Sequence, residues 1–368
     1  MTWNWQQPDW PDFRWEPNRL AKAEEKFVRE TGIFLGTARH LQPGDRDQLR
    51  VEVMSSEALT TSAIEGEILN RDGVQSSIRR QLGLAADNRR VQPAERGVSE
   101  LMVNLYRGFA ESLADPVLFG WYGMLMQGRK DLRHPGGYRT DSQPMQVVSG
   151  PADNHRVHFE APPSRTLAKE MKAFMRWFNR TAPDGREPLP ALTRAGIAHL
   201  YFVSVHPFED GNGRIGRAIS EKALAQGLGQ PALTALAATI LAKRKGYYAA
   251  LEGANQGNEI TEWLCWFAEV AIEAQQRTTR RVEFLIEKTQ LLARLRGELN
   301  ARQEKALLRV LREGPEGFRG GLRANNYMTI TGTSAATATR DLADLVAKGA
   351  LRRMGEHRYA RYYVAITI

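Results

Sequence analysis

Apolar residues recur every three or four positions along most of the chain, which is the spacing that places side chains on one face of an α-helix. Val98, Leu101 and Leu105 follow this spacing, and the stretch 191–205 is apolar enough to be a buried helix. The pattern therefore predicts a mainly α fold. Its helices are expected at positions 20–38, 55–66, 92–125, 164–178, 191–205, 268–300, 303–311 and 335–348.

Two stretches depart from the helical spacing because their apolar and polar residues alternate. The first comprises 145–150 and 155–159 on either side of a turn at Pro151–Asn154, and it predicts a β-hairpin. The second comprises 351–353 and 359–364 and predicts another hairpin near the end of the chain. The expected fold is thus an all-helical core with one hairpin, followed by helices with a second hairpin.

Composition restricts the class of protein. In a chain of 368 residues no apolar run is long enough to cross a bilayer, and the first residues lack the basic and apolar segments of a secretory signal. The single cysteine, Cys265, excludes an internal disulfide and fits a reducing compartment. We therefore expect a cytoplasmic protein with no membrane partner.

The stretch 206–217 reads His-Pro-Phe-Glu-Asp-Gly-Asn-Gly-Arg-Ile-Gly-Arg and carries the most chemistry. Pro207 disfavours the helical conformation for the residue before it, so the helix 191–205 should end there and present the His206 imidazole at the mouth of a loop. Asp210 follows in that loop, where a carboxylate can hold a Mg²⁺ that bridges two phosphates. His206 is then free to act on a proton beside that phosphate.

The remainder of this stretch provides groups that bind anions. The sequence Gly211-Asn212-Gly213 can open the backbone so that successive N–H groups point at one anion, at the start of a new helix. Arg214 and Arg217 lie three positions apart, on one helical face, and can form paired hydrogen bonds to phosphate oxygens. The stretch therefore predicts a phosphate site.

These residues resemble the Fic family signature, His-Pro-Phe-x-Asp/Asn-Gly-Asn-Gly-Arg-x-x-Arg, at every fixed position. Fic proteins transfer AMP from ATP to a hydroxyl side chain of a target protein. The resemblance implies that His206 is the general base on that hydroxyl and that Asp210 is the Mg²⁺ ligand. It also implies that Asn212 and the flanking glycine amides hold the α-phosphate, Arg214 the β-phosphate and Arg217 the γ-phosphate.

Residues 61–66, Thr-Ser-Ala-Ile-Glu-Gly, look like the inhibitory motif of Fic proteins, Ser/Thr-x-x-x-Glu-Gly/Asn. The resemblance implies that Glu65 forms a salt bridge with Arg217 and takes the place of the γ-phosphate. A carboxylate can mimic one pair of phosphate oxygens for a guanidinium, so ATP would bind in a pose wrong for in-line attack. Because the motif is part of the same chain, the inhibition would be intramolecular.

The hairpin at 145–159 has a role by the same resemblance. In Fic proteins a hairpin at this place forms a flap that aligns the target segment by main-chain pairing, which fixes a hydroxyl in space with little demand on sequence. His155 and His158 of the hairpin have no nearby cysteine or third histidine to complete a metal site. We expect them on the surface of the flap.

Residues 245–255 resemble the Fic segment that closes over the adenine and ribose. Tyr248 would stack on the base and Asn255 would hydrogen-bond it. Tyr247 is a third candidate for nucleotide binding. Two tyrosines in a helix are core residues in most proteins, so this assignment rests on the resemblance alone.

The chain after position 301 is basic, with 12 Lys and Arg against 6 Asp and Glu. Its helix-turn-helix followed by a hairpin resembles a winged helix, with Ser334 to Arg340 in the recognition position. The region 334–361 would then bind DNA, unless it serves as a protein-binding or dimer module. The arginines expected to contact phosphates are Arg352, Arg353, Arg358 and Arg361.

The order of these features predicts four parts: an N-terminal aromatic module with the inhibitory helix (1–90), a Fic core (91–275), a helical linker (276–300) and a winged helix (301–368). The aromatic module is expected to dock on its own core. It contains Trp3, Trp5, Trp10, Phe13 and Trp15.

We expect an ATP- and Mg²⁺-dependent protein adenylyltransferase acting on Ser, Thr or Tyr hydroxyls, its own included, and held off by Glu65. Two alternatives stand beside it. One is a de-AMPylase, in which Glu65 positions a water that releases AMP. The other is a transcription regulator, in which the core senses nucleotide and the winged helix binds an operator. The donor could also be another nucleotide such as UTP. Fic proteins often form homodimers, so the resemblance also implies a possible homodimer.

Overall fold

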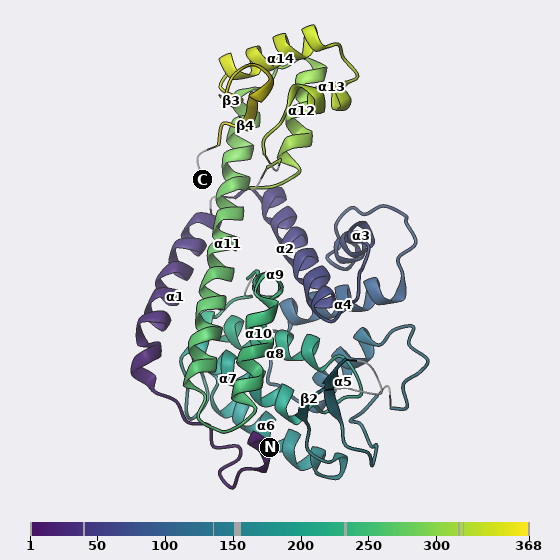
Figure 1. The fold of residues 1–368 in the computed structure, drawn as a ribbon, viewed down its shortest axis with the longest axis vertical. Coiled ribbons are helices and arrows are strands. Elements are labelled where there is room, and N and C mark those ends of the chain that lie inside the picture. The colour runs from purple at the N-terminus through teal and green to yellow at the C-terminus, as the bar shows by residue number, and fades with distance from the viewer. Residues whose placement is uncertain are drawn as a thin grey trace. The chain divides into compact units, whose positions relative to one another are not determined.

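The computed structural model describes residues 2–39, 41–134, 136–150, 156–231, 234–315, 317–318 and 320–366. The chain divides into two compact units, the first made of Met1–Ile33 and Arg50–Thr278 and the second of Phe34–Leu49 and Thr279–Ile368. Three helices have residues in both units (Figure 1): α1 (Pro17–Ala38), α2 (Pro43–Ile64) and α11 (Thr261–Arg294).

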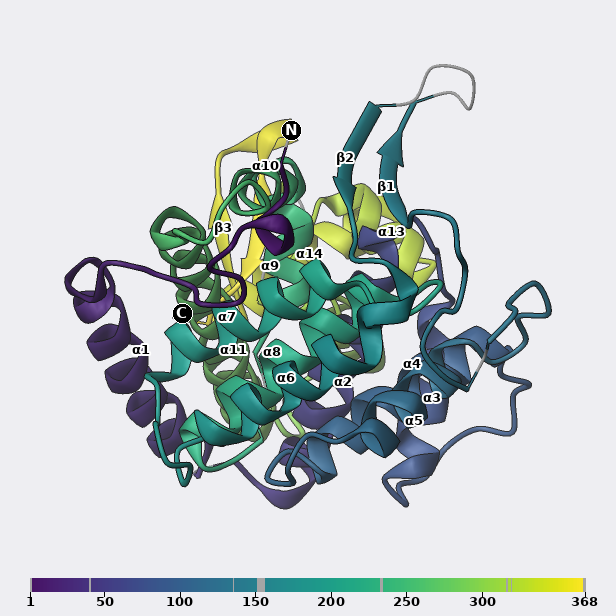
Figure 2. The same ribbon diagram turned by 90° about the horizontal axis from the view of Figure 1, so that it is seen from below.

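The first unit is helical apart from one hairpin, as predicted. Its other helices are α3 (Arg71–Gln81), α4 (Pro93–Arg107), α5 (Asp115–Leu125), α6 (Leu167–Arg180), α7 (Ala191–Val205), α8 (Asn212–Leu228), α9 (Leu236–Ala242) and α10 (Arg244–Ala254), with short 3-10 turns η1 (Asn4–Gln6) and η2 (Ser164–Thr166). Strands β1 (Gln146–Ser149) and β2 (Arg156–Glu160) pair antiparallel and project from the helices (Figure 2). The expected turn at Pro151–Asn154, and His155, lie outside the described residues.

Helix α7 lies at the centre of the first unit, and nearly all of its side chains are buried. It packs along α8 and also contacts α6 and η1. A helix that is apolar on every side needs neighbours all round it, so α7 is held in place by the whole core. Its C-terminal end is therefore a fixed point of the fold.

The predicted helix over 92–125 proves to be two helices, α4 and α5. Gly108 caps α4 at its C-terminus by donating its N–H to the carbonyl of Asn104 at 2.8 Å. Pro116 lies in the first turn of α5, where its missing N–H costs nothing. The periodicity continues across the break because both helices bury a face in the same core.

The stretch predicted as a separate helix over 268–300 belongs to one longer helix, α11, which begins at Thr261 and ends at Arg294. The sequence pattern places a break near position 268 because the residues change from mainly aromatic to mainly charged. No Gly, Pro or cap separates the two halves, so the backbone has no reason to leave the helix.

The aromatic segment before α1 docks on the first unit, as expected. The ring of Trp10 lies 5.1 Å from that of Tyr201 in α7, edge to face, and Phe13 lies 5.6 Å from the same ring. The backbone of Arg14 pairs with Glu259 as a short parallel bridge. The segment is therefore part of the core rather than a free tail.

The second unit contains helices followed by a hairpin, as the sequence pattern predicts. Besides its parts of α1, α2 and α11 it contains α12 (Ala301–Leu311), α13 (Ala324–Thr331), α14 (Ala335–Ala347), β3 (Leu351–Met354), the 3-10 turn η3 (His357–Tyr359) and β4 (Arg361–Val364). β3 and β4 pair antiparallel. Gly332, at φ 70°, ends α13, and Ser334 caps the N-terminus of α14.

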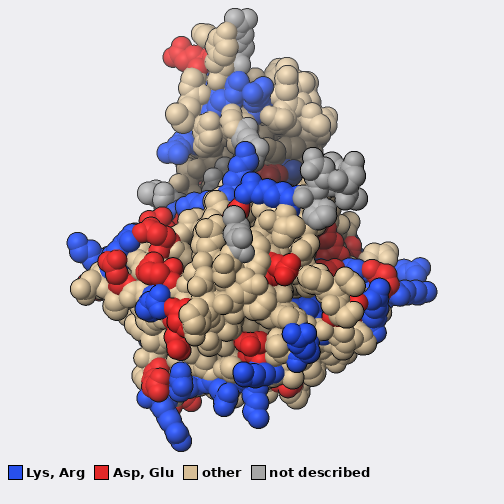
Figure 3. Space-filling view, turned by 60° about the horizontal axis from the view of Figure 1, so that its bottom comes forward, with Lys and Arg blue, Asp and Glu red and all other residues tan. Residues whose placement is uncertain are grey.

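The surface carries both signs of charge. On the face drawn in Figure 3, Lys and Arg are interspersed with Asp and Glu rather than gathered into one patch. Within the described ranges, no helix combines the length and the apolar character needed to cross a membrane.

Candidate active site

The end of α7 presents His206 to a pocket. His206 caps the helix in a left-handed conformation, φ 50°, and its N–H still bonds the carbonyl of Phe202 at 3.0 Å. Its Nδ1 lies 3.3 Å from the carbonyl of Val203. Because a carbonyl only accepts, the proton of a neutral ring sits on Nδ1 and the lone pair on Nε2. Burial lowers the pKa of His206 to about 4, so the ring is neutral at pH 7.

Arg139 fixes the backbone that carries His206. Its guanidinium donates to the carbonyl of His206 at 2.8 Å and to that of Pro162 at 2.6 Å. Its own N–H donates to the carbonyl of Pro207 at 2.9 Å. In the sequence Arg139 follows Tyr138 in a glycine-containing turn and gives no sign of this role, which depends on residues far away along the chain.

The loop between α7 and α8 is closed on itself. Phe208 is buried and stacks on Tyr122, with 4.3 Å between ring centroids. Asn212 accepts from the Phe208 N–H at 3.0 Å and donates to the Phe208 carbonyl at 2.8 Å. The Asn212 side chain therefore shapes the loop. Its contribution to a phosphate would come from its backbone N–H in the first turn of α8.

Two glycines are needed where the loop meets α8. Gly211 has φ 78°, and a Cβ there would come 2.9 Å from the side chain of Met126. A Cβ on Gly213 would collide with the carboxylate of Glu65. The bare backbone at Gly213 is thus what allows Glu65 to lie over the first turn of α8.

Arg217 is buried and bound to the end of α2. Its guanidinium donates to a Glu65 carboxylate oxygen at 2.7 Å, to the Thr61 hydroxyl at 2.7 Å and to the Thr61 carbonyl at 2.9 Å. The ion pair between Glu65 and Arg217 that the resemblance implies is therefore present. Burial alone would lower the pKa of Arg217, but the negative charge of Glu65 outweighs it and raises the pKa.

Arg214 has a carboxylate partner that the sequence analysis missed. Its guanidinium is buried and lies 2.7 Å from a carboxylate oxygen of Glu67 and 3.6 Å from one of Asp210. Glu67 follows Glu65 by two positions, just after α2 ends at Ile64. The Glu-Gly-Glu order is a signal in the sequence, because one short turn carries two carboxylates that meet both arginines of the 206–217 stretch.

Asp210 is an ionised carboxylate just before α8. One carboxylate oxygen accepts from Arg129 at 2.7 Å and the other accepts from the Gly211 N–H at 2.5 Å. Burial alone would raise the pKa of Asp210, but the hydrogen bond from Arg129 and the charge of Arg214 lower it, so the carboxylate is ionised. Arg129 is another residue that the sequence analysis missed.

The residues present fit a Mg²⁺ bound together with a nucleotide better than an all-protein metal site. The part of the chain that the structure describes holds no group of three or more metal-ligating side chains. Mg²⁺ is usually held by one or two carboxylates, with phosphate oxygens and water completing its shell. Asp210 lies beside Arg214 at the start of α8, where such a metal would meet phosphate oxygens.

A pocket of about 470 Å³ joins Glu65, His206 and Gly213 to the flap and to α10. Tyr247 is buried in its wall, with its hydroxyl 2.9 Å from Nε2 of the core residue His199, whereas Tyr248 is half-exposed. Asn255 caps α10 and also faces the pocket. The predicted site residues among its lining are Glu65, His206, Gly213, Tyr247, Tyr248 and Asn255. The flap contributes Val147, Val148, Ser149, His158 and Phe159.

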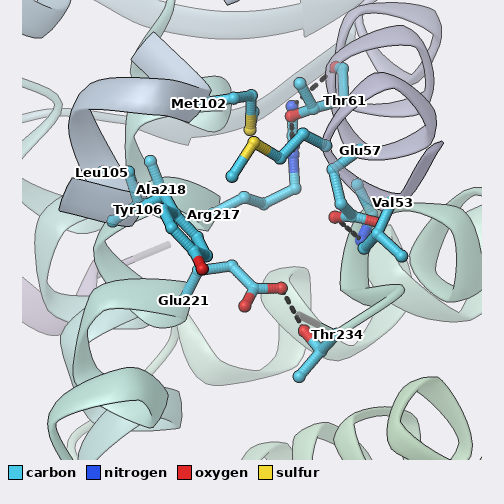
Figure 4. Close-up of a pocket in the computed structure, with 12 residues that line it drawn as sticks. Val53, Glu57, Thr61, Met102, Leu105, Tyr106, Arg217, Ala218, Glu221 and Thr234 are labelled. Carbon is cyan, nitrogen blue, oxygen red and sulfur yellow. Dashed lines mark hydrogen bonds between the residues drawn. The ribbon is translucent and has the colours of Figure 1, made fainter. Parts of the chain in front are cut away.

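A smaller cavity of about 40 Å³ lies next to Arg217 (Figure 4). Glu57 of α2 borders it and accepts from the N–H of Ala237, and Glu221 of α8 is hydrogen-bonded to Thr234. Burial raises the pKa of Glu57 to about 7 and raises that of Glu221 as well. Together with the hydrogen bonds that Arg217 donates to Thr61, these contacts hold the last turns of α2 against α8 and α9.

Comparison with known proteins shows which families this chain is similar to. Residues 115–224, from α5 to α8, match the Fic/DOC family, and residues 3–84 match a domain of unknown function, DUF4172. The match includes the whole stretch 206–217, and the region 3–84 includes both Glu65 and Glu67.

Solved structures of Fic proteins have a similar fold. A Fic family protein from Desulfovibrio desulfuricans is 20% identical, with 93% of this chain and 95% of that chain covered and a TM-score of 0.52. A Fic domain containing signaling protein from Bacteroides thetaiotaomicron is 16% identical, with 70% and 98% covered and a TM-score of 0.52. A fragment of Fic-1 from C. elegans is 19% identical, with 74% and 76% covered and a TM-score of 0.51. At these identities the likeness is one of fold.

Proposed function

We propose that this chain is a protein adenylyltransferase, which transfers AMP from ATP to a Ser, Thr or Tyr hydroxyl of a target protein, and that Glu65 holds it inactive. The observation that carries the proposal is the pocket shared by His206, Gly213 at the start of α8, and Tyr248 and Asn255 of the α10 region. A neutral imidazole, a helix N-terminus and a surface for a nucleobase then face one space.

The chemistry follows from these positions. The target hydroxyl oxygen attacks the α-phosphorus of ATP, the bond from that phosphorus to the bridging oxygen breaks, and pyrophosphate leaves. The hydroxyl proton passes to Nε2 of His206, which is the ring nitrogen that keeps its lone pair. A Mg²⁺ bound at Asp210 would neutralise charge on the phosphates. The first-turn N–H groups of α8 would hold the α-phosphate, and Arg214 and Arg217 the outer two.

Two carboxylates would oppose this reaction. Glu65 occupies Arg217 and Glu67 occupies Arg214, so both guanidinium groups that would receive phosphate oxygens already have an anionic partner. ATP binding would have to displace both carboxylates before its phosphates could align for in-line attack. Glu67 thus extends the inhibition from one arginine to two.

The position of the label on ATP tests the reaction type. In the full-length Glu65→Gly protein we expect label from the α-phosphate to become bound to protein, and label from the γ-phosphate to leave with pyrophosphate. Intact-mass and peptide mass spectrometry would locate the added AMP. Transfer of the γ-label instead would show a kinase-type reaction, and label from UTP but not from ATP would show a different donor.

DNA binding by the second unit is the second candidate, because α14 and β3 carry exposed arginines. Arg340 is exposed on α14, and Arg352 and Arg353 are exposed on β3. Arg361 of β4 is half-buried, and the side chain of Arg358 lies outside the described residues. The arrangement fits phosphate contacts on either side of a recognition helix.

Salt dependence tests this second function. We expect the full-length protein to shift a duplex, with an affinity that falls as salt rises. Replacing Arg352 and Arg353 together by alanine should weaken binding about tenfold or more. It should also reduce the slope of log affinity against log salt concentration by about two, because two phosphate contacts are lost. A shift that is absent at low salt, or unchanged in the double variant, would exclude this surface from DNA binding.

A further inference from the structure

The residues Trp3, Asn4 and Trp5 contact three separate parts of the candidate active site. They open the region that matches a domain of unknown function, and Asn4 and Trp5 lie in the turn η1. Figure 2 shows this N-terminal segment, in purple, beside α10, where the Asn4 N–H donates to the carbonyl of Asn255 at 2.7 Å. The proposed chemistry uses none of the three residues.

The two tryptophans hold the base of the flap. The indole N–H of Trp5 donates to the carbonyl of Glu160 at 2.6 Å, and Trp3 packs edge to face on Phe159 with 5.4 Å between ring centroids. Trp3, Phe159 and Ala161 form a small buried cluster apart from the main core. Phe159 also lines the 470 Å³ pocket, so the position of β2 at that pocket depends on these two tryptophans.

Asn4 controls the direction of the Asn255 side chain. Asn4 is fully buried, and its Nδ2 donates to the hydroxyl of Ser204 at 2.9 Å. That hydroxyl donates to Oδ1 of Asn255 at 3.5 Å. Because a serine hydroxyl has one proton, accepting from Asn4 leaves that proton for Asn255. The amide of Asn255 is then turned so that its Nδ2 is the group that can donate to an acceptor atom in the pocket.

We propose that Trp3, Asn4 and Trp5 are positioning residues of the transferase: the tryptophans fix the flap that presents the target, and Asn4 orients the amide that meets the nucleobase. The proposal rests on the proposed function and gives the N-terminal part of the DUF4172 region a role. The same tripeptide contacts β2 of the flap and the residue that caps α10. It therefore fixes the position of the target hydroxyl relative to the nucleotide that donates AMP.

A matched pair of tryptophan variants tests the flap part, in the full-length Glu65→Gly protein. Each substitution removes one indole N–H. Trp5→Phe removes the donor to the Glu160 carbonyl, and Trp10→Phe removes the donor to the Glu170 carboxylate at 2.9 Å. Trp5→Phe should lower the rate of self-labelling at saturating ATP about threefold to tenfold, the size of one lost hydrogen bond, with little change in ATP affinity. Hydrogen exchange of residues 156–160 should become faster. Trp10→Phe should change neither.

A double-mutant cycle tests the relay through Ser204. Asn4→Ala and Ser204→Ala should each weaken ATP binding, measured by calorimetry, about fivefold, and the double variant should be no weaker than either alone. Additive losses would overturn the relay. Equal effects of Trp5→Phe and Trp10→Phe, or unchanged exchange at residues 156–160, would overturn the flap role.

These readouts are separate from the proposed function itself. ATP affinity and hydrogen exchange require no catalysis. If no variant becomes labelled, the transferase proposal fails, and the exchange of residues 156–160 together with the binding cycle still decides whether the three residues position the pocket.

Discussion

Replacing Glu65 by glycine raises the rate of AMP transfer, including self-modification, by an expected factor of about ten to one hundred. The partly buried, charge-assisted bond from Arg217 to Glu65, 2.7 Å long, must break before Arg217 can receive a phosphate. Bonds of this kind contribute about 1.5–3 kcal/mol, which corresponds to a factor of roughly ten to one hundred. Rates of self-labelling with ATP labelled on the α-phosphate measure the gain.

Glu67 makes this prediction sharper. Glu67→Gln should raise the rate less than Glu65→Gly, because Arg214 keeps Asp210 as a partner at 3.6 Å. The double variant should exceed either single variant. Glu65→Gln is the matched control, since it keeps the shape and removes the charge, and it should give an intermediate gain. A Glu65→Gly protein no faster than wild type would contradict the inhibitory role of Glu65. If Glu67→Gln changes the rate neither in the wild-type protein nor in the Glu65→Gly protein, the inhibition is restricted to Glu65.

Replacing His206 by alanine in the Glu65→Gly background lowers the transfer rate by an expected factor of about one hundred to ten thousand. This is the usual contribution of a positioned general base. Nδ1 of His206 is bound to the Val203 carbonyl, so alanine removes the one lone pair, on Nε2, that can take the proton. The affinity for ATP should change little, because His206 acts on the acceptor. A rate that survives the substitution would assign the base to another group.

The pH dependence of the same reaction has a definite sign. The reaction needs the neutral ring, and burial lowers the pKa of His206 to about 4. The rate should therefore stay level from pH 7 down to about pH 5 and fall only below it, whereas a histidine in water would lose half its activity near pH 6.5. The charge of Glu65 acts to raise the pKa of His206. The Glu65→Gly substitution should therefore not shift the fall in rate to a higher pH. A midpoint near pH 6.5 would show that the ring is solvated during catalysis.

The sequence was most informative where chemistry is concentrated in consecutive residues. The pattern of apolar positions predicts most of the helices and both hairpins, because burial dictates it. The stretch 206–217 also predicts the end of α7 at His206, because Pro207 forces the backbone out of the helix. These features depend on local rules that neighbouring residues obey.

The features that the sequence left unseen depend on contacts between distant residues. Arg139 lies 67 positions from His206, and Arg129 lies 81 positions from Asp210. Nothing near either arginine in the sequence distinguishes it from a surface residue. The direction of the Asn212 side chain also depends on the closed loop, since the same asparagine could have faced a phosphate.

The order of the chain adds a consequence of the Glu65 contact. Glu65 precedes Arg217 by 152 positions, and Tyr248 and Asn255 come later still. A ribosome makes the turn that carries Glu65 before it makes the rest of the pocket, and proteins begin to fold from the N-terminus during synthesis. Under the proposed function, the growing polypeptide therefore holds its blocking carboxylate before it can form a finished nucleotide pocket.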